Sequence, residues 1–138
     1  MREHLERIIR DFGANSGTIH RMGADGQLHL TASVGIPEQV LRIVAVIPVG
    51  KGMAGLAAER REPVSVCNLQ TDTSGDVRPG AKATGMEGAI ALPMFAGDQV
   101  AGVLGIANRD PRTFTAEETE RLLDEGRRLA ALANFAVN

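Results

Sequence analysis

Residues 88–107, which read GAIALPMFAGDQVAGVLGIA, decide the fold. They predict two apolar strands, 88–95 and 99–107, joined by a tight turn that contains a Gly-Asp pair. The second strand carries apolar side chains on both faces, which is typical of a strand in the middle of a sheet that is covered on both sides. Gly102 and Gly105 would allow close packing in such a strand.

A second hairpin is predicted nearer the N-terminus, with strands at 17–22 and 27–34. Asp25-Gly26, between them, is a strong signal for a tight turn. Because hairpins dominate the strand pattern, we expect a mainly antiparallel sheet. His20 and His29 could face one another across this hairpin, as a surface pair rather than as metal ligands.

Amphipathic helices are predicted at both ends of the chain. Residues 1–13 place apolar side chains at helical spacing and charges on the other face. The last helix is predicted over 115–137, with Thr115 as its N-cap and Glu118 completing a capping box. Its apolar surface, which includes Phe135, is broader than one packing face needs, and this favours a homodimer formed through the terminal helices.

Three glycines punctuate residues 47–61, which read IPVGKGMAGLAAERR and predict a short alanine-rich helix. A Gly-x-Gly-x-x-Gly run also occurs in dinucleotide-binding folds. Those folds need an uninterrupted parallel strand before the run and an acidic residue at a later strand end. Pro48 interrupts the preceding strand, and Asp72 and Asp76 lie in a polar loop, so the sequence disfavours an NAD site.

The remaining long segment, 68–85, is polar, rich in turn residues and without clear periodicity, as functional or mobile loops are. The predicted fold is therefore α+β, with a central antiparallel sheet of five or six strands. The terminal helices should pack together on one face of this sheet. The short helices and the long loop should cover the other face.

Composition excludes several function classes. Among 138 residues, 15 Lys and Arg and 17 Asp and Glu give a net charge of -2, which does not suit a nucleic-acid surface. Trp and Tyr are absent and Phe numbers 4, which leaves few rings for stacking on bases or sugars. The charged start is unlike a signal peptide, and no apolar run reaches membrane-spanning length. We expect one cytoplasmic domain, 1–138, with no membrane partner.

Taken together, these segments resemble a GAF domain, a small-molecule sensing module of signalling proteins with a fold related to that of PAS domains. The resemblance covers almost the whole chain and rests on three segments in order: 48–57 with Pro63-Val64-Ser65-Val66 and Asn68, then 91–106, then Asn108-Arg109 with 114–118. It implies a non-catalytic regulatory domain of bacterial-type signalling, with a possible output domain or partner protein.

The resemblance also implies where a ligand would bind. GAF-like proteins bind small molecules between the sheet and the segments that correspond here to 53–60 and 68–86. The residues that it marks as ligand-binding are Met53, Ala54, Asn68, Asp76, Val77, Thr84, Met86, Ala89 and Ala91. Mostly apolar walls with a few polar groups suit a small-molecule pocket. The identity of the ligand stays open, and neither a cofactor nor a metal ion is expected.

Three alternatives remain. A purely structural dimerisation module would bind nothing. A methionine sulfoxide reductase-like enzyme would use Cys67, the only cysteine, and would lack the second thiol that clears a sulfenic acid. Cyclic-nucleotide-binding members carry Asn-Lys, then Phe and an Asp-Glu pair. Here Asn108-Arg109, Phe114 and Glu118-Thr119 only partly match that pattern, although Arg109 could still pair with Glu118.

Overall fold

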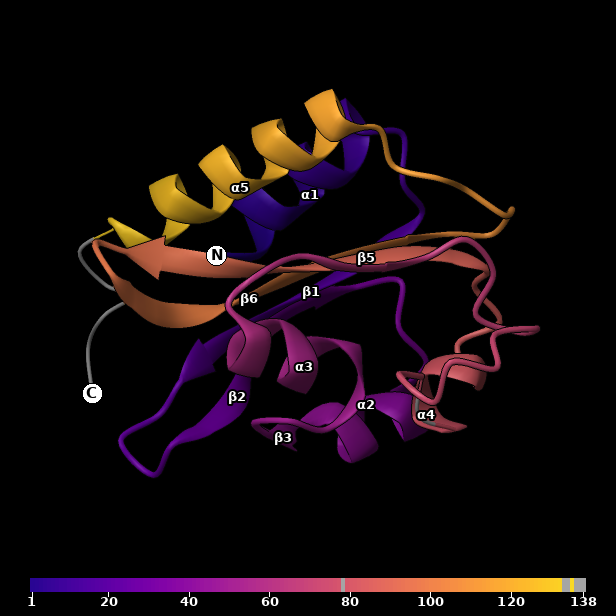
Figure 1. Cartoon of the computed structure of the whole chain (residues 1–138), viewed down its shortest axis with the longest axis horizontal. Coiled ribbons are helices and arrows are strands. Elements are labelled where there is room, and N and C mark those ends of the chain that lie inside the picture. Colours follow the sequence, from indigo (N-terminus) through magenta and orange to yellow (C-terminus); the bar gives the residue numbers. More distant parts are fainter. Residues whose placement is uncertain (78, 133–134, 136–138) are drawn as a thin grey trace.

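The computed structural model describes residues 1–77, 79–132 and 135. A six-stranded antiparallel sheet with the strand order β3-β2-β1-β6-β5-β4 runs through the middle of the molecule, and helices cover both of its faces (Figure 1). The strands are β1 (Ser16–Met22), β2 (Gln27–Val34), β3 (Val46–Pro48), β4 (Val64–Val66), β5 (Gly88–Ala96) and β6 (Gln99–Asn108).

The helices form two layers, as the sequence predicts. Above the sheet in Figure 1 lie α1 (Arg2–Asp11) and α5 (Ala116–Ala130), side by side. Below it lie α2 (Glu38–Val44), α3 (Gly52–Arg60) and the single turn α4 (Pro79–Lys82). The α+β fold is confirmed, including the central position of β6, which pairs with β1 on one side and β5 on the other.

The layer between the sheet and the terminal helices holds the main hydrophobic core. Leu5 of α1, Leu122 of α5 and Leu104 of β6 are fully buried in it. Arg7 of α1 donates two hydrogen bonds, of 2.9 and 3.0 Å, to the buried carboxylate of Glu125 on α5. These hydrogen bonds lower the pKa of Glu125, so the carboxylate stays charged and joins the two helices.

The helix at the C-terminal end is shorter than predicted. Its capping box forms as expected, because Thr115 accepts a hydrogen bond from the backbone N–H of Glu118 at 3.0 Å. However, α5 ends at Ala130, and Phe135 packs into the helix-side core with 1% of its surface exposed. The rest of the predicted helix end, at 133, 134, 136 and 137, lies outside the described residues.

Burial of Phe135 has a physical cause in β6. A Cβ added at Gly102 would lie 2.9 Å from Cζ of the Phe135 ring, so the ring rests directly on this glycine. Phe135, one of the apolar residues that favoured a dimer, therefore packs inside its own chain. At the other end, α1 stops at Asp11, and Gly13 follows with a φ of +64°, in the left-handed region that glycine favours.

Candidate ligand-binding site

A cavity of about 350 Å³ lies on the face of the sheet opposite the terminal helices. Its floor is formed by β1, β5 and β6, and its roof by α2, the start of α3 and the segment around α4. The side chains of the floor are Ser16, Thr18, His20, Ala89, Ala91, Val103 and Ala107. Those of the roof include Val40, Ile43, Val44, Met53, Ala54, Ala81, Thr84 and Met86. This volume is at the lower end of the range for small-molecule sites, about 300–1,000 Å³.

The floor of the cavity lacks a side chain at one position, Gly105. Gly105 of β6 pairs with Thr18 on β1 and with Ala91 on β5. A Cβ added at Gly105 would meet only Thr18 Oγ1 at 3.3 Å and the backbone oxygen of Ile90 at 3.8 Å. Of the two β6 glycines expected to allow close packing, Gly102 lies against backbone and the Phe135 ring, whereas the nearest neighbour at Gly105 is the hydroxyl of Thr18, which can rotate.

Polar side chains form a row on the floor. Ser16, Thr18 and His20 alternate along β1 with residues that face the terminal helices, so all three share the cavity face. Ser16 and His20 are each only 1% exposed. Among the described residues, neither the Ser16 hydroxyl nor His20 Nδ1 has a hydrogen-bond partner. Leaving a buried polar group unpaired costs about 1–3 kcal/mol, so each of these atoms lowers the stability of this face.

His20 also links the floor to the roof. Its Nε2 lies 2.8 Å from the backbone oxygen of Val44, at the C-terminal end of α2. Because a carbonyl oxygen only accepts, Nε2 is the donor and Nδ1 carries a free lone pair. Burial lowers the pKa of His20 below its usual value, which keeps the ring neutral at pH 7.

The predicted surface pair of His20 and His29 is wrong. From the turn onward β1 pairs with β2 so that Leu30 stands opposite His20 and His29 stands opposite Arg21. His29 instead lies near the hairpin turn, with its Nε2 2.9 Å from the carboxylate of Asp25. Among the described residues, no group of three or more His, Cys, Asp or Glu side chains could hold a metal ion.

The N-terminal end of α3 forms one wall of the cavity. Gly50 and Gly52 adopt φ values of +92° and +66°, which let the chain turn sharply from β3 into α3. No side chain caps this helix, and the first-turn N–H groups of Met53 and Ala54 have no partner within the helix. Among the described residues, Lys51 also lines the cavity and no Asp or Glu does. The wall is therefore weakly positive.

A protein-family model described as a GAF domain matches residues 1–137. The chain belongs to the GAF domain family. The strand that precedes its glycine run, β3, is a three-residue antiparallel strand at the sheet edge, unlike the parallel strand of a dinucleotide fold. Comparison with curated protein sequences gives no significant match. Within the part of the chain that the structure describes, no helix has the length and apolar character needed to cross a membrane.

Solved structures of similar fold come from signalling proteins and from enzymes. The GAF domain of a phosphoenolpyruvate-protein phosphotransferase from Coxiella burnetii has a TM-score of 0.79 at 21% identity, covering 94% of this chain and 77% of that one. A domain described as part of a two-component sensor histidine kinase from Sinorhizobium meliloti 1021 has a TM-score of 0.73 at 18% identity, covering 93% and 84%.

Another similar structure is the free methionine-R-sulfoxide reductase from Neisseria meningitidis in complex with its substrate. Its TM-score is 0.79 at 17% identity, and the match covers 98% of this chain and 76% of that one. At such identities the likeness shows the GAF fold, and it does not transfer an activity.

Six of the nine predicted ligand-binding residues line the cavity of this GAF domain: Met53, Ala54, Thr84, Met86, Ala89 and Ala91. The other three lie outside its lining. Asn68 donates to Glu87 Oε2 at 2.7 Å and accepts from the backbone N–H of Gln70, so it shapes the loop. Val77 packs against the neighbouring apolar cluster of Leu69 and Met86.

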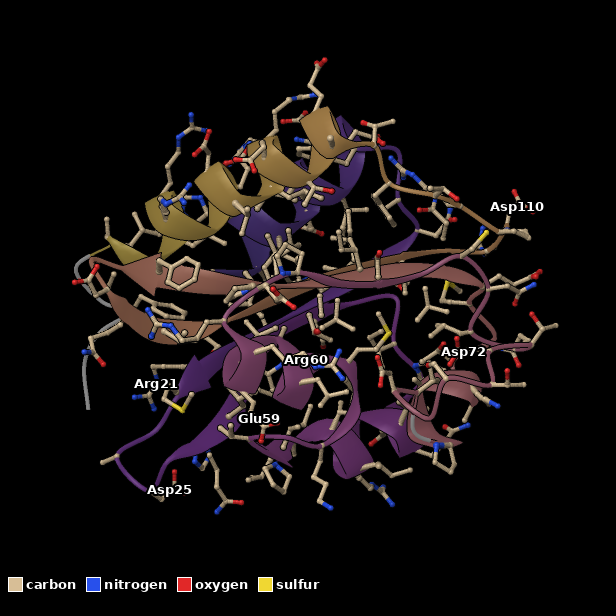
Figure 2. All side chains as sticks on the ribbon, viewed as in Figure 1. Arg21, Asp25, Glu59, Arg60, Asp72 and Asp110 are labelled. Atoms are coloured by element: carbon tan, nitrogen blue, oxygen red, sulfur yellow. The ribbon has the colours of Figure 1, made fainter. Side chains whose placement is uncertain are left out.

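Asp76 is held by an ion pair instead of facing the cavity. Its carboxylate lies 3.3 Å from the guanidinium of Arg60, at the end of α3. Figure 2 shows Arg60 below the sheet, on the side that carries α3. The pair joins the segment after β4 to α3, and Asp76 is not among the residues that line the cavity.

The sequence analysis missed the β1 and α2 contributions to the cavity. The signal in β1 was available, since Ser16, Thr18 and His20 recur at every second residue, as one face of a strand requires. For α2, no local signal exists. Its Val40 and Ile43 look like ordinary apolar positions, and only the tertiary fold places them over the floor.

The predicted pair of Arg109 with Glu118 is also wrong. Glu118 Oε2 accepts a hydrogen bond of 2.6 Å from Arg112, whose guanidinium lies over the ring of Phe114 at 4.3 Å from its centroid. The turn after β6 brings Arg112, not Arg109, back toward α5. This ion pair joins the loop after β6 to α5 and is not part of the cavity lining.

Proposed function

We propose that this GAF domain is a non-catalytic sensory and regulatory module that binds a small molecule in the cavity between the sheet and the 53–86 segments. The observation that carries the proposal is the cavity of about 350 Å³, whose walls are mostly apolar with a few polar side chains. A domain that served only as a spacer would gain stability by filling this space. This cost is offset when a ligand occupies the cavity.

A bound ligand would reach the terminal helices through β1. This strand follows α1 after a short turn, and its His20 holds the end of α2 through the Val44 carbonyl. The ligand would order the 68–85 segment and alter the strain on β1. The Arg7–Glu125 contact would carry the change from α1 to α5. Such coupling requires the ligand to bind two states of the domain with different affinities.

Partner chains would meet this domain at its terminal helices. A homodimer remains a prediction that now depends on the outer surfaces of α1 and α5, since Phe135 is buried within the chain. Sedimentation equilibrium tests it directly. A dimer at micromolar concentration is expected, and a monomer at tens of micromolar would exclude it.

The ligand-binding proposal is tested by calorimetric unfolding against a panel of nucleotides, cyclic nucleotides, 2-oxo acids and amino acids. A compound that binds only the native state adds about 2.7 kcal/mol at a hundredfold excess over its dissociation constant. Gly105→Val is the matched variant, because its side chain would occupy the bare part of the floor. We expect stabilisation of the unaltered domain and none of Gly105→Val.

Two results would contradict the proposal. Equal stabilisation of the two proteins would place binding outside the cavity. If no compound in the panel stabilises the unaltered domain, the structural dimerisation module becomes the better explanation.

A methionine sulfoxide reductase-like enzyme is the second candidate, because reductases that act on free methionine sulfoxide share this fold. The exposed Cys67 follows β4 and is not among the residues that line the cavity, so its thiol would have to act elsewhere. The test is turnover of free methionine sulfoxide with dithiothreitol as reductant. Turnover that disappears in Cys67→Ser would favour the enzyme, and absence of turnover would remove it.

A further inference from the structure

We infer that the cavity takes a small molecule whose buried part is a hydrocarbon body with a single polar group, and that the hydroxyl of Thr18 is the partner of that group. The inference rests on the proposed function, since it assumes that a small molecule binds in the cavity. It adds the chemical class of that molecule and a residue that contacts it.

The walls that a ligand can touch are mostly apolar. The half-buried apolar residues of the lining, which keep some exposed surface, are Ile36, Val44, Met53, Ala54, Ala81 and Ala107. Ile43 of α2 adds an apolar side chain at the mouth, because it lines the cavity and is 55% exposed. A hydrocarbon body that covers these side chains gains free energy in proportion to the apolar area removed from water. Binding is therefore expected to depend mainly on the hydrophobic effect.

Most polar side chains of the lining cannot serve a ligand. Ser16 Oγ and His20 Nδ1 have almost no exposed surface, and His20 Nε2 already donates to a backbone carbonyl at the end of α2. Thr84 Oγ1 donates to the carbonyl of Ala81 at 2.6 Å and accepts from the N–H of Met86 at 3.1 Å. A molecule with many donors and acceptors, such as a nucleotide, would leave most of them unpaired in this cavity, which lowers its affinity.

Thr18 is the exception on the floor. The residue is half-buried, and its hydroxyl makes no hydrogen bond with any described residue. Unlike Ser16 Oγ and His20 Nδ1, Thr18 Oγ1 is not one of the buried atoms without a partner, so it keeps surface that a ligand can reach. A hydroxyl both donates and accepts, so it can pair with an alcohol, a phenol or a carbonyl group.

The space beside this hydroxyl is open because β6 has a glycine there. Gly105 pairs with Thr18 across the two strands, and a Cβ added at Gly105 would lie 3.3 Å from Thr18 Oγ1. The next nearest atom to that position is the backbone oxygen of Ile90, at 3.8 Å. A ligand atom can therefore take the place that a side chain at Gly105 would have filled, close to the Thr18 hydroxyl.

Charged groups have no partner of opposite charge on the floor. Among the described residues, Lys51 is the one charged side chain of the lining, and it is exposed. A carboxylate or ammonium group carried down to Thr18 would lose its hydration with no opposite charge to replace it. A charged part of a ligand would therefore remain at the mouth of the cavity, in contact with water.

Two probe molecules of nearly equal shape test the role of Thr18, since phenol carries a hydroxyl where toluene carries a methyl group. Thr18→Val removes the hydroxyl of the residue and keeps its branched shape, which suits a strand. We expect Thr18→Val to weaken phenol binding about fivefold and not to weaken toluene binding, as measured by NMR titration of the whole chain. Thr31→Val, at an exposed position of β2 outside the cavity lining, is the control and should change neither affinity.

Two further measurements make the test independent of a single variant. Thr18→Ser keeps the hydroxyl, so it should retain the preference for phenol that Thr18→Val loses. In the unaltered protein, phenol should give intermolecular NOEs to the Thr18 methyl group and to the α protons of Gly105, a readout that needs no variant to fold. Adenosine monophosphate tests the chemical class, because an excess of it should not displace toluene.

Three results would overturn the inference. Equal effects of Thr18→Val on phenol and toluene, or phenol bound without NOEs to Thr18 and Gly105, would show that this hydroxyl does not hold the polar group, while the cavity could still bind a ligand. Displacement of toluene by adenosine monophosphate would refute the apolar class. If neither toluene nor phenol binds, the inference is wrong, and the metabolite panel with Gly105→Val still decides the proposed function separately.

Discussion

On the face of the sheet that carries α1 and α5, 17 of the described residues form one continuous core, whereas the opposite face holds two smaller clusters of 7 and 4 residues. The space between those two clusters is the cavity of about 350 Å³. Helices cover both faces in Figure 1, so the difference lies in the side chains. Gly105 leaves the floor bare, and two buried polar atoms have no partner.

This comparison separates stability from function within one sheet. The terminal-helix face follows the usual rules of a well-packed interior, with large apolar side chains and a paired buried charge. The cavity face breaks two of those rules, because it leaves space unfilled and polar groups unpaired. Departures of this kind are expected at functional sites, where stability is given up for binding.

The largest effect expected is on packing. Leu104→Ala, on the terminal-helix face, should lower the free energy of unfolding by about 3–5 kcal/mol, since this side chain is fully enclosed. Leu69→Ala, beside the cavity, should cost only about 2 kcal/mol, because Leu69 already borders empty space and loses fewer contacts. Urea denaturation measures both. Equal losses would mean that the two faces are packed alike.

The two glycines of β6 test the same difference in packing between the two faces of the sheet. In Gly102→Ala the new methyl group would clash with the backbone oxygen of His20 and press on the Phe135 ring, which should cost about 1–3 kcal/mol. In Gly105→Ala the new methyl group would meet the Thr18 hydroxyl at 3.3 Å, a tight contact that rotation of the Thr18 side chain relieves, so stability should change by no more than about 0.5 kcal/mol. Thermal unfolding of the two variants compares them. Equal destabilisation of both would mean that Gly105 is packed as closely as Gly102.

A third prediction concerns the contact between the terminal helices. Arg7→Met should lower stability by about 1–3 kcal/mol at pH 7, because the buried Glu125 loses its main donor. Arg127→Met is the control, since the pair of Arg127 with Asp124 is exposed and should contribute no more than about 0.5 kcal/mol.

The Arg7 effect should depend on pH in a defined direction. Because Arg7 lowers the pKa of Glu125 in the folded state, the stabilisation is fully present above the ordinary carboxyl pKa of 4.5. It is lost as the pH falls through the lower folded value, so the unaltered domain and Arg7→Met should converge in acid. A stability difference that stays constant down to the lowest pH at which the domain folds would contradict this.

The smallest effect is expected at Ser16. Its hydroxyl has no partner among the described residues, so Ser16→Ala should leave the free energy of unfolding unchanged or raise it by up to about 1 kcal/mol. Ser65→Ala, at an exposed position of β4, is the matched control on the same sheet. A clear loss of stability in Ser16→Ala alone would mean that the hydroxyl has a partner and that the floor is not unsatisfied.

The sequence could predict elements whose signals are local. The 88–107 hairpin and the Thr115 capping box follow from apolar runs, turn residues and fixed spacings, and the structure has them. Six of the nine predicted site residues line the cavity, because Met53, Met86 and their neighbours lie in segments that the family resemblance places around a pocket.

What the sequence could not predict depends on register and long-range packing. The partner of His20 across the hairpin is set by the register of β1 with β2, which places Leu30 opposite His20 and His29 opposite Arg21. Asp76 turns to Arg60 because the chain passes that helix end after β4. The ring of Phe135 packs on Gly102, which lies over 30 residues earlier in the chain. None of these has a signature within a short window of sequence.

The most direct test of a ligand site on one face of the sheet is an NMR titration of the methionine methyl groups. Met53 and Met86 line the cavity, whereas Met94 is fully buried on the terminal-helix face. With a compound that stabilises the domain, the account predicts shifts of the Met53 and Met86 methyl resonances and little change at Met94. Unchanged Met53 and Met86 resonances, or a shift at Met94 as large as theirs, would contradict it.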